Sequence, residues 1–174
     1  MTYEPGECIV IDSIIFDVWG DPAPQGSKRA FVIKKGKMKG KVAMSEMSKK
    51  VKPWRARIAS VARTEAARMK WSKQADGPVR VVIQFFMRPP KTPKWKALGR
   101  PDRMPDIDKL ARSTLDGLSD SGVIYGDDRQ VVDLHCIQHY ATDGHSPGAR
   151  INVVSLREAS KPIKKSDHES AIKA

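Results

Sequence analysis

The sequence predicts an α+β fold, a two-layer domain in which two main helices cover a mixed sheet of four to five strands. Two observations support this prediction. Four segments are rich in β-branched or aromatic residues and have the length of strands, and two others carry apolar residues at helical spacing. The chain of 174 residues is also about one domain in length, which is enough to bury a hydrophobic core.

A strand, a loop and a hairpin are predicted first. Residues 8–19, CIVIDSIIFDVW, are rich in β-branched residues and predict a strand. The Pro- and Gly-rich stretch 20–29 is a loop that ends in two cations. Residues 30–45 then predict a short, lysine-rich hairpin that turns between Gly36 and Gly40.

The first helix follows this hairpin. Ser45 is the preferred N-cap and Ser48 the alternative, and Pro53 is tolerated only in the first turn. The helix should extend to about Lys70. Its core face is marked by apolar residues at helical spacing, namely Trp54, Ile58, Val61, Ala62 and Met69.

A central strand and a long loop come next. Residues 79–87, VRVVIQFFM, are hydrophobic enough for a strand in the middle of a sheet. The Pro- and Lys-rich loop at 88–105 is longer than ordinary connections, and such loops are often functional. A second helix of about three turns is then predicted by the spacing of Ile107, Leu110, Ala111, Thr114 and Leu118.

The C-terminal part supplies the last two strands, at 130–141 and 149–158. Residues 1–158 therefore form one predicted domain. Residues 159–174 have no apolar periodicity, and we expect them to be a disordered polar tail.

The charge of the chain is large and unevenly distributed. The formal net charge is +12 and the isoelectric point is about 9.9. Twelve Lys or Arg and one acid occur from Lys28 to Arg57, whereas seven Asp and three cations occur from Asp106 to Asp133. The basic run alone also fits a solvated face, but a basic surface beside an acidic centre favours a polyanion that reaches a site holding cations.

Cysteine usage and hydropathy predict a cytoplasmic protein without a membrane partner. Cys8 and Cys136 form neither a CxxC motif nor a disulfide framework. No apolar run approaches the roughly 18 to 20 residues that cross a bilayer. The apolar stretch near the N-terminus is interrupted by Asp12 and lacks a preceding basic region, so it is typical of a strand rather than a signal peptide.

One pair of aspartates stands in the motif MPDIDKL. Asp106 and Asp108 are two residues apart, which on a regular helix would turn them about 200° away from each other. They can face one site if Asp106 lies at or before the N-cap, a position that Pro105 favours. Asp108 then lies in the first turn, with Arg112 one turn later on the same side.

A second pair, Asp127 and Asp128, directly precedes the strand predicted at 130–141. Each pair also has a purely structural explanation, because Asp caps helices, complements their dipole and is common in turns. Several carboxylates on neighbouring elements nevertheless suit hard cations with oxygen ligands, Mg²⁺ above all. Such metals activate water and neutralise phosphate charge in phosphodiester hydrolysis. The residues therefore predict Mg²⁺-dependent phosphodiester chemistry on nucleic acid.

The segment PDIDKLARSTLDGLSDSGVIYGDDRQVVD (105–133) resembles the signature of the RusA family of Holliday junction resolvases from bacteria and phages. That signature reads Pro-Asp-x-Asp-Asn-Leu, then a lysine and an aspartate on one helix, then Asp-Asp-x-Gln-Val. The resemblance extends more weakly over residues 15–158. The matching positions are Pro105, Asp106, Asp108, Leu110, Asp116, Asp127, Asp128, Gln130 and Val131.

Two positions depart from that signature. Lys109 stands where the family has asparagine, so it could weaken metal binding or add a phosphate contact. Arg112 stands where the family has lysine, and arginine can hold a phosphate but is a poor proton carrier. The chain also has one residue more than expected before Asp127. These departures concern catalytic efficiency and leave the predicted fold unchanged.

The resemblance implies a homodimer that cuts symmetrically related strands of a four-way DNA junction with Mg²⁺, in recombination and repair, without a small-molecule cofactor. By this analogy Asp106, Asp108 and Asp128 are the leading catalytic metal ligands, with Asp127 beside them and Arg112 as a catalytic cation. Trp95 could stack on an unpaired base or anchor its own loop. The candidate DNA contacts are Lys28, Arg29, Lys37, Lys39, Lys41, Lys109 and Trp95.

Three alternatives remain from the sequence. A non-catalytic basic DNA-binding protein explains the charge but not the four aspartates. A nucleotidyltransferase also uses an Asp-x-Asp pair, but usually on a strand after Gly-Ser. A zinc site in HCIQH is disfavoured, because on a strand Cys136 points away from His135 and His139.

Overall fold

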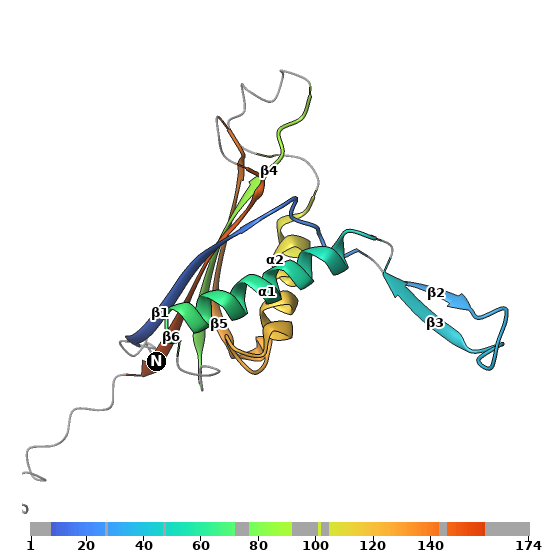
Figure 1. The fold of residues 1–174 in the computed structure, drawn as a ribbon, viewed down its shortest axis with the longest axis horizontal. Helices are drawn as coiled ribbons and strands as arrows, with labels where there is room; N and C mark the ends of the chain where they lie inside the picture. The colour runs from blue at the N-terminus through green and yellow to red at the C-terminus, as the bar shows by residue number, and fades with distance from the viewer. Residues whose placement is uncertain are drawn as a thin grey trace, which may run out of the picture.

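The computed structural model describes residues 8–26, 28–46, 48–71, 77–91, 101, 105–142 and 146–158. It confirms the predicted α+β fold, with a helical layer against one face of a sheet and a small hairpin that stands away from this body (Figure 1). In chain order the elements are β1 (Cys8–Trp19), β2 (Lys28–Val32), β3 (Val42–Glu46), α1 (Val51–Arg68), β4 (Val79–Met87), α2 (Ile107–Ser121), the 3-10 helix η2 (Asp128–Gln130), β5 (Val131–Tyr140) and β6 (Gly148–Glu158).

The main sheet has four strands in the order β1-β6-β4-β5. β4 pairs in parallel with β5 and antiparallel with β6, so the sheet is mixed and β4 is internal, as its hydrophobic sequence predicts. The parallel pair requires a crossover connection, and α2 lies in that connection. Because β5 follows α2 after a short turn, the end of α2 lies near the start of β5.

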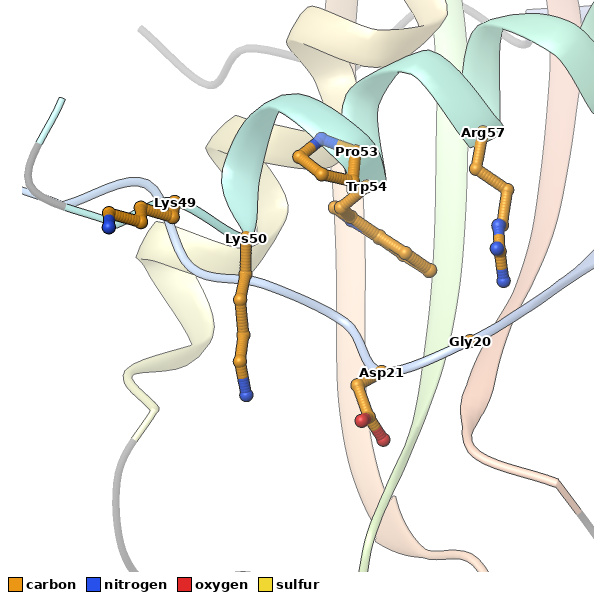
Figure 2. Close-up of a pocket in the computed structure, with 7 residues that line it drawn as sticks. All are labelled: Gly20, Asp21, Lys49, Lys50, Pro53, Trp54 and Arg57. Atoms are coloured by element: carbon orange, nitrogen blue, oxygen red, sulfur yellow. The ribbon is translucent and has the colours of Figure 1, made fainter.

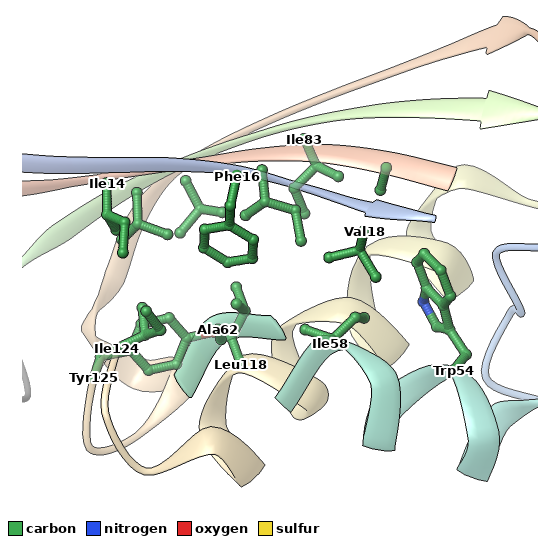
Figure 3. Packing of buried hydrophobic residues seen from close by; sticks show 14 of the residues in the cluster. Ile14, Phe16, Val18, Trp54, Ile58, Ala62, Ile83, Leu118, Ile124 and Tyr125 are labelled. Carbon is green, nitrogen blue, oxygen red and sulfur yellow. The ribbon is translucent and has the colours of Figure 1, made fainter. Parts of the chain in front are cut away.

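The core lies between the helices and one face of the sheet (Figure 3). Alternate residues of β1 and β4 point into it, in the two-residue period of a strand. The indole nitrogen of Trp54 donates a 3.3 Å hydrogen bond to Thr114 and so satisfies a buried polar pair between α1 and α2. The fully buried side chains include Ile14, Val18, Ile58, Ala62, Val81, Ile83, Phe85, Leu110, Leu118, Ile124 and Tyr125.

The two helices approach each other closely at Gly117. A Cβ at this position would lie 3.0 Å from the Cβ of Ile58 and 3.2 Å from both the Cα and the carbonyl oxygen of Arg55. The missing side chain is therefore what lets α2 pack against the backbone of α1. This contact fixes the position of α2, and with it the acidic motif at its start.

Some predicted details of the elements are wrong. Ser45 is not a helix cap, because it lies in β3 opposite Arg29; α1 begins at Val51 with Lys50 as its N-cap. Met69 is 40% exposed, because the helix ends at Arg68 and the helical spacing that predicted its burial no longer applies at this C-cap. Ile107, in the first turn of α2, is 39% exposed.

Two helix and strand boundaries also differ from the prediction. α2 extends to Ser121 and ends at Gly122, which adopts the left-handed conformation (φ 69°) that glycine accommodates. β2 begins at Lys28, inside the stretch predicted as a loop. The predicted tail at 159–174 lies outside the described residues. Within the described part, no helix is long and apolar enough to cross a membrane.

Candidate active site

Asp106 is the N-cap of α2, as predicted. Its backbone is extended (φ −65°, ψ 136°), and its carbonyl oxygen accepts a 3.1 Å hydrogen bond from the N–H of Leu110. Asp108 therefore lies in the first helical turn. Both side chains are exposed, so both carboxylates are accessible at the start of the helix. The resulting change from extended to helical backbone allows the two side chains to share one site despite their spacing.

A cation accompanies this pair. The ammonium group of Lys109 donates a hydrogen bond to Asp106 and forms an ion pair with it. This bond and the charge of Asp106 raise the pKa of Lys109 above its ordinary value. Asp108 and Arg112 are both exposed and do not form an ion pair with each other. Asp108 is thus the freer carboxylate of the pair, and Arg112 has its guanidinium available for a ligand.

Three hydrogen bonds hold the first turns of α2 in place. Gln138, near the end of β5, donates a 3.0 Å bond to the carbonyl oxygen of Pro105. The segment that follows β1 supplies the other two: the N–H of Gln25 donates to the carbonyl oxygen of Lys109 at 2.9 Å, and Ser113 donates to that of Ala23 at 2.6 Å. The acidic motif is therefore mounted on fixed backbone rather than on a loose loop.

The second acidic pair forms a tight turn before β5. Asp127 is the N-cap of η2, and one of its oxygens accepts 2.9 Å bonds from both the backbone N–H and the Nε of Arg129. These bonds hold the pKa of Asp127 below its usual range. Gln130 closes the capping box by accepting from the N–H groups of Gly126 and Asp127. Asp128 is exposed. Asp127 thus has a clear structural role, whereas Asp128 faces solvent.

The two pairs lie at opposite ends of α2 within one chain (Figure 1). Asp106 and Asp108 are at its start, beside the end of β5, while Asp127 and Asp128 follow its end and precede the start of β5. A 15-residue helix spans about 22 Å. Consistent with this separation, no group of three or more His, Cys, Asp or Glu side chains that could hold a metal ion is found among the described residues.

Acidic side chains on the second half of α2 have structural partners. Asp116, part of the family signature, forms a 3.1 Å ion pair with Arg55 of α1, and Asp120 forms one of 2.8 Å with the same guanidinium. Tyr125 lies nearby, fully buried, and burial raises its pKa well above the ordinary value. The sequence places Asp116 in the signature but does not reveal Arg55 as its partner, because that contact spans two helices.

The structure describes some of the candidate DNA contacts and not others. Lys37, Lys39 and Lys41 are exposed around the turn of the β2–β3 hairpin, far from the body of the protein in Figure 1. Lys28 and Arg29 lie in β2, but their side chains are not described. Trp95 lies outside the described residues. Of the predicted DNA-binding surface, the structure therefore describes the exposed cationic arm and Lys109 in the first turn of α2.

The HCIQH segment lies in β5. Cys136 packs against the hydrophobic core, and burial raises the pKa of its thiol to about 11. His139 instead stacks on Phe86 of the adjacent strand, with ring centroids 6.1 Å apart. Successive strand residues point to opposite faces, so this thiol and this imidazole lie on different sides of the sheet.

Comparison with known proteins places this fold and acidic motif in a family. The family model described as endodeoxyribonuclease RusA matches residues 21–154, which include the hairpin and both aspartate pairs. The chain therefore belongs to the RusA endodeoxyribonuclease family, and this membership implies a junction-resolving endonuclease. The chain is also 31% identical, over 144 residues, to the uncharacterized protein YqaN of Bacillus subtilis (strain 168). That match covers 76% of this chain and 92% of YqaN.

Proposed function

We propose that this protein is a Mg²⁺-dependent endonuclease that resolves four-way DNA junctions by phosphodiester hydrolysis, as a homodimer, in recombination or repair. The observation that carries the proposal is the placement of the family motif: Asp106 caps α2 and Asp108 occupies its first turn, both accessible. The predicted setting is the cytoplasm of a bacterium or of a phage-infected cell.

The first acidic pair fits a magnesium ion. Mg²⁺ is usually held by one or two carboxylates, together with waters and substrate phosphate oxygens. Asp106 and Asp108 offer two carboxylates at the N-cap and in the first turn of one helix, and both side chains are exposed among the described residues. When bound there, the metal would supply an activated water and compensate the charge of the transferred phosphate.

The neighbouring cations suit the same chemistry. Lys109 balances the charge of Asp106, and the partners of its ammonium group could shift from this carboxylate to a DNA phosphate. Arg112, one turn beyond Asp108, can hold the scissile phosphate or its neighbour through the fixed fork of its guanidinium. Since arginine stays protonated over the accessible pH range, we assign it charge stabilisation rather than proton transfer.

A two-fold dimer gives the second acidic pair a role. Asp127 and Asp128 lie about one helix length from Asp106 in their own chain, too far to share a metal ion with it. A symmetric dimer can bring Asp128 of the partner subunit to the first pair, and the two-fold axis then produces two equivalent sites. Paired sites suit paired cuts in a branched, nearly symmetric DNA.

The cationic hairpin would supply much of the affinity for DNA. Lys37, Lys39 and Lys41 stand on an arm that projects from the body (Figure 1), where they can reach phosphates away from the cut. Contacts of this kind act on the backbone and carry little sequence information. Junction selectivity would instead come from the geometry of the two sites in the dimer.

A labelled four-way junction and a linear duplex of matched sequence, each with and without Mg²⁺, test this function. We expect paired nicks in the junction only when Mg²⁺ is present, and little cutting of the duplex. A shifted junction without nicks would support the alternative, a non-catalytic DNA-binding protein. The nucleotidyltransferase alternative is weakened by the position of Asp106 and Asp108, which lie at the start of a helix and not on a strand.

A further inference from the structure

A cavity opens between the start of α1 and the segment that follows β1 (Figure 2). Its volume is about 320 Å³, within the range of small-ligand sites. Trp54 and Pro53 give it an apolar wall, and Gly20 keeps the opposite side open. A Cβ on Gly20 would overlap the guanidinium of Arg57, so a larger residue there would require this side chain to shift.

The cavity is strongly cationic. Lys49, Lys50 and Arg57 line it, against the single carboxylate of Asp21. Asp21 is already paired with Arg88, at 3.0 Å, so it does not neutralise these three cations. In Figure 2 the side chains of Lys50 and Arg57 extend from α1 toward the segment with Gly20 and Asp21, on either side of the Trp54 ring.

Arg57 is held in place before any ligand binds. Its Nη1 donates a 2.7 Å hydrogen bond to the carbonyl oxygen of Trp19, which fixes the guanidinium while leaving other N–H donors for a second partner. Lys49 and Lys50 are exposed, and neither forms an ion pair with another described residue. Three cations around an apolar wall, one of them fixed, form a site for an anion that carries some apolar surface.

The cavity continues toward the acidic motif. Lys50 and Asp21 also line a second cavity, of about 310 Å³, whose wall includes Pro105. Pro105 directly precedes Asp106. On its other side the first cavity adjoins Lys49, shortly after the end of the β2–β3 hairpin. The two cavities thus share Lys50 and Asp21, and they lie between the end of the cationic arm and the residue that precedes Asp106.

We infer that the cavity lined by Lys49, Lys50 and Arg57 binds a backbone phosphate of the DNA strand that is being cut, near the scissile phosphate. The phosphate would contact the three cations, and its deoxyribose would pack on Trp54 and Pro53. This inference rests on the proposed function, since it assumes that the strand enters the acidic motif of the same chain. It adds a positioning site that the family signature does not contain.

The test combines charge removal in the protein with charge removal in the DNA. Single methylphosphonate groups, which lack the phosphate charge, are placed one at a time at the three positions on each side of the crossover in the strands of a four-way junction. Affinity is measured without Mg²⁺ for the wild type and for the double variant Lys49→Gln, Lys50→Gln. The control variant is Lys52→Gln, Lys70→Gln, which removes the same charge from exposed positions of the same helix region outside the cavity.

We expect one methylphosphonate position to weaken wild-type binding by roughly fivefold, the counterion-release contribution of one phosphate contact near 0.15 M salt. The affinity of the Lys49, Lys50 variant for the unmodified junction should fall by a similar factor. A methylphosphonate at the sensitive position should not weaken binding by this variant any further. The control variant should keep the full methylphosphonate penalty. If each methylphosphonate weakens binding by the wild type and by the Lys49, Lys50 variant to the same extent, the inference is wrong.

Nicking by the wild type in Mg²⁺ separates this inference from the proposed function. If the wild type nicks the junction and the Lys49, Lys50 variant shows the same methylphosphonate penalties as the control variant, only the proposed phosphate site is wrong. If the wild type binds with the expected phosphate dependence but never nicks, the nuclease function is wrong and the contact stands. If both variants unfold at the same temperature as the wild type, a lower DNA affinity of either variant does not result from misfolding.

Discussion

Gln138 donates a 3.0 Å hydrogen bond to the carbonyl oxygen of Pro105, and this bond joins the end of β5 to the start of α2. Because Asp127 and Asp128 precede the start of β5, the same bond places Asp106 and Asp108 at the opposite end of the helix–strand unit. Two carboxylate pairs of one signature are therefore kept apart in each chain. If both pairs act in one site, the second pair must come from another protomer.

Mixed dimers test this arrangement. A dimer with Asp108→Asn in one protomer and Asp128→Asn in the other has one intact site if the pairs meet between protomers, and none if each protomer uses its own pairs. We expect it to nick one strand of a junction. The matched control combines Asp106→Asn with Asp108→Asn, which damages both sites in either arrangement. A mixed dimer as inactive as this control would exclude sharing between protomers.

Removal of single carboxylates should separate cutting from binding. Asp106→Asn, Asp108→Asn or Asp128→Asn should abolish junction cutting, because each removes a proposed metal ligand and the charge compensation that depends on it. Junction affinity should survive, because it comes from the cationic surface. The measurements are single-turnover cutting in Mg²⁺ and electrophoretic binding without it. Any of the three variants that cuts at the wild-type rate shows that its residue is no ligand.

Salt dependence should identify the arm that binds DNA. Replacement of Lys37, Lys39 and Lys41 by alanine removes three exposed cations from the hairpin turn. If each contacts a phosphate, the slope of log affinity against log salt should become shallower by about three. Titrations between low and physiological salt measure this slope. An unchanged slope would move the main DNA-binding surface away from the β2–β3 hairpin.

Arg112 should contribute to cutting through its charge. Arg112→Ala should lose roughly 2–4 kcal/mol of transition-state stabilisation, the scale of one preorganised charge or donor. Arg112→Lys should stay active, because it keeps the charge. A loss of helix stability cannot explain the difference, since Arg112 forms no ion pair with Asp108. Single-turnover cutting at saturating enzyme measures the effect, and a rate for Arg112→Ala within about twofold of wild type would refute it.

Gly117→Ala should destabilise the protein although alanine is the better helix former. Alanine gains about 1 kcal/mol in helix propensity, but its Cβ would lie 3.2 Å from the backbone of Arg55, which cannot move without displacing α1. We expect a net loss of up to about 2 kcal/mol in the free energy of unfolding, since overpacking costs about 1–3 kcal/mol and the gain in helix propensity offsets about 1 kcal/mol of it. Urea denaturation measures it. Ser60→Ala, at an exposed position of α1, is the control and should be neutral.

Local patterns predict much of this fold from the sequence. The β-branched run of β4 and the Pro-Asp start of α2 depend on neighbouring residues, and the structure confirms both. Ser45 misleads because its capping preference is overridden by pairing with Arg29 in the hairpin. Met69 and Ile107 continue a helical stripe of apolar residues, but they lie at the C-cap of α1 and in the first turn of α2, where both are exposed.

The site is harder to predict because it depends on the direction of α2. The sequence contains one signal for this direction: β5 follows α2 after a short turn, so residues at the start of the helix and before the strand lie about a helix length apart. The cavity beside Gly20 has no comparable signal. Lys50 and Arg57 belong to an evident cationic region, but only the packing of the segment after β1 places them around one space.

The last strand of the described residues, β6, lies inside the main sheet. Val153 of β6 pairs with Ile14 of β1 on one side and with Val81 of β4 on the other. Because β6 is translated after β1 and β4, neither strand can form its pairing with β6 until residues 148–158 have left the ribosome. A shortened product that ends before Gly148 leaves β1 with no partner in this sheet. A product shortened in this way therefore lacks the complete sheet that supports the acidic motif at the start of α2.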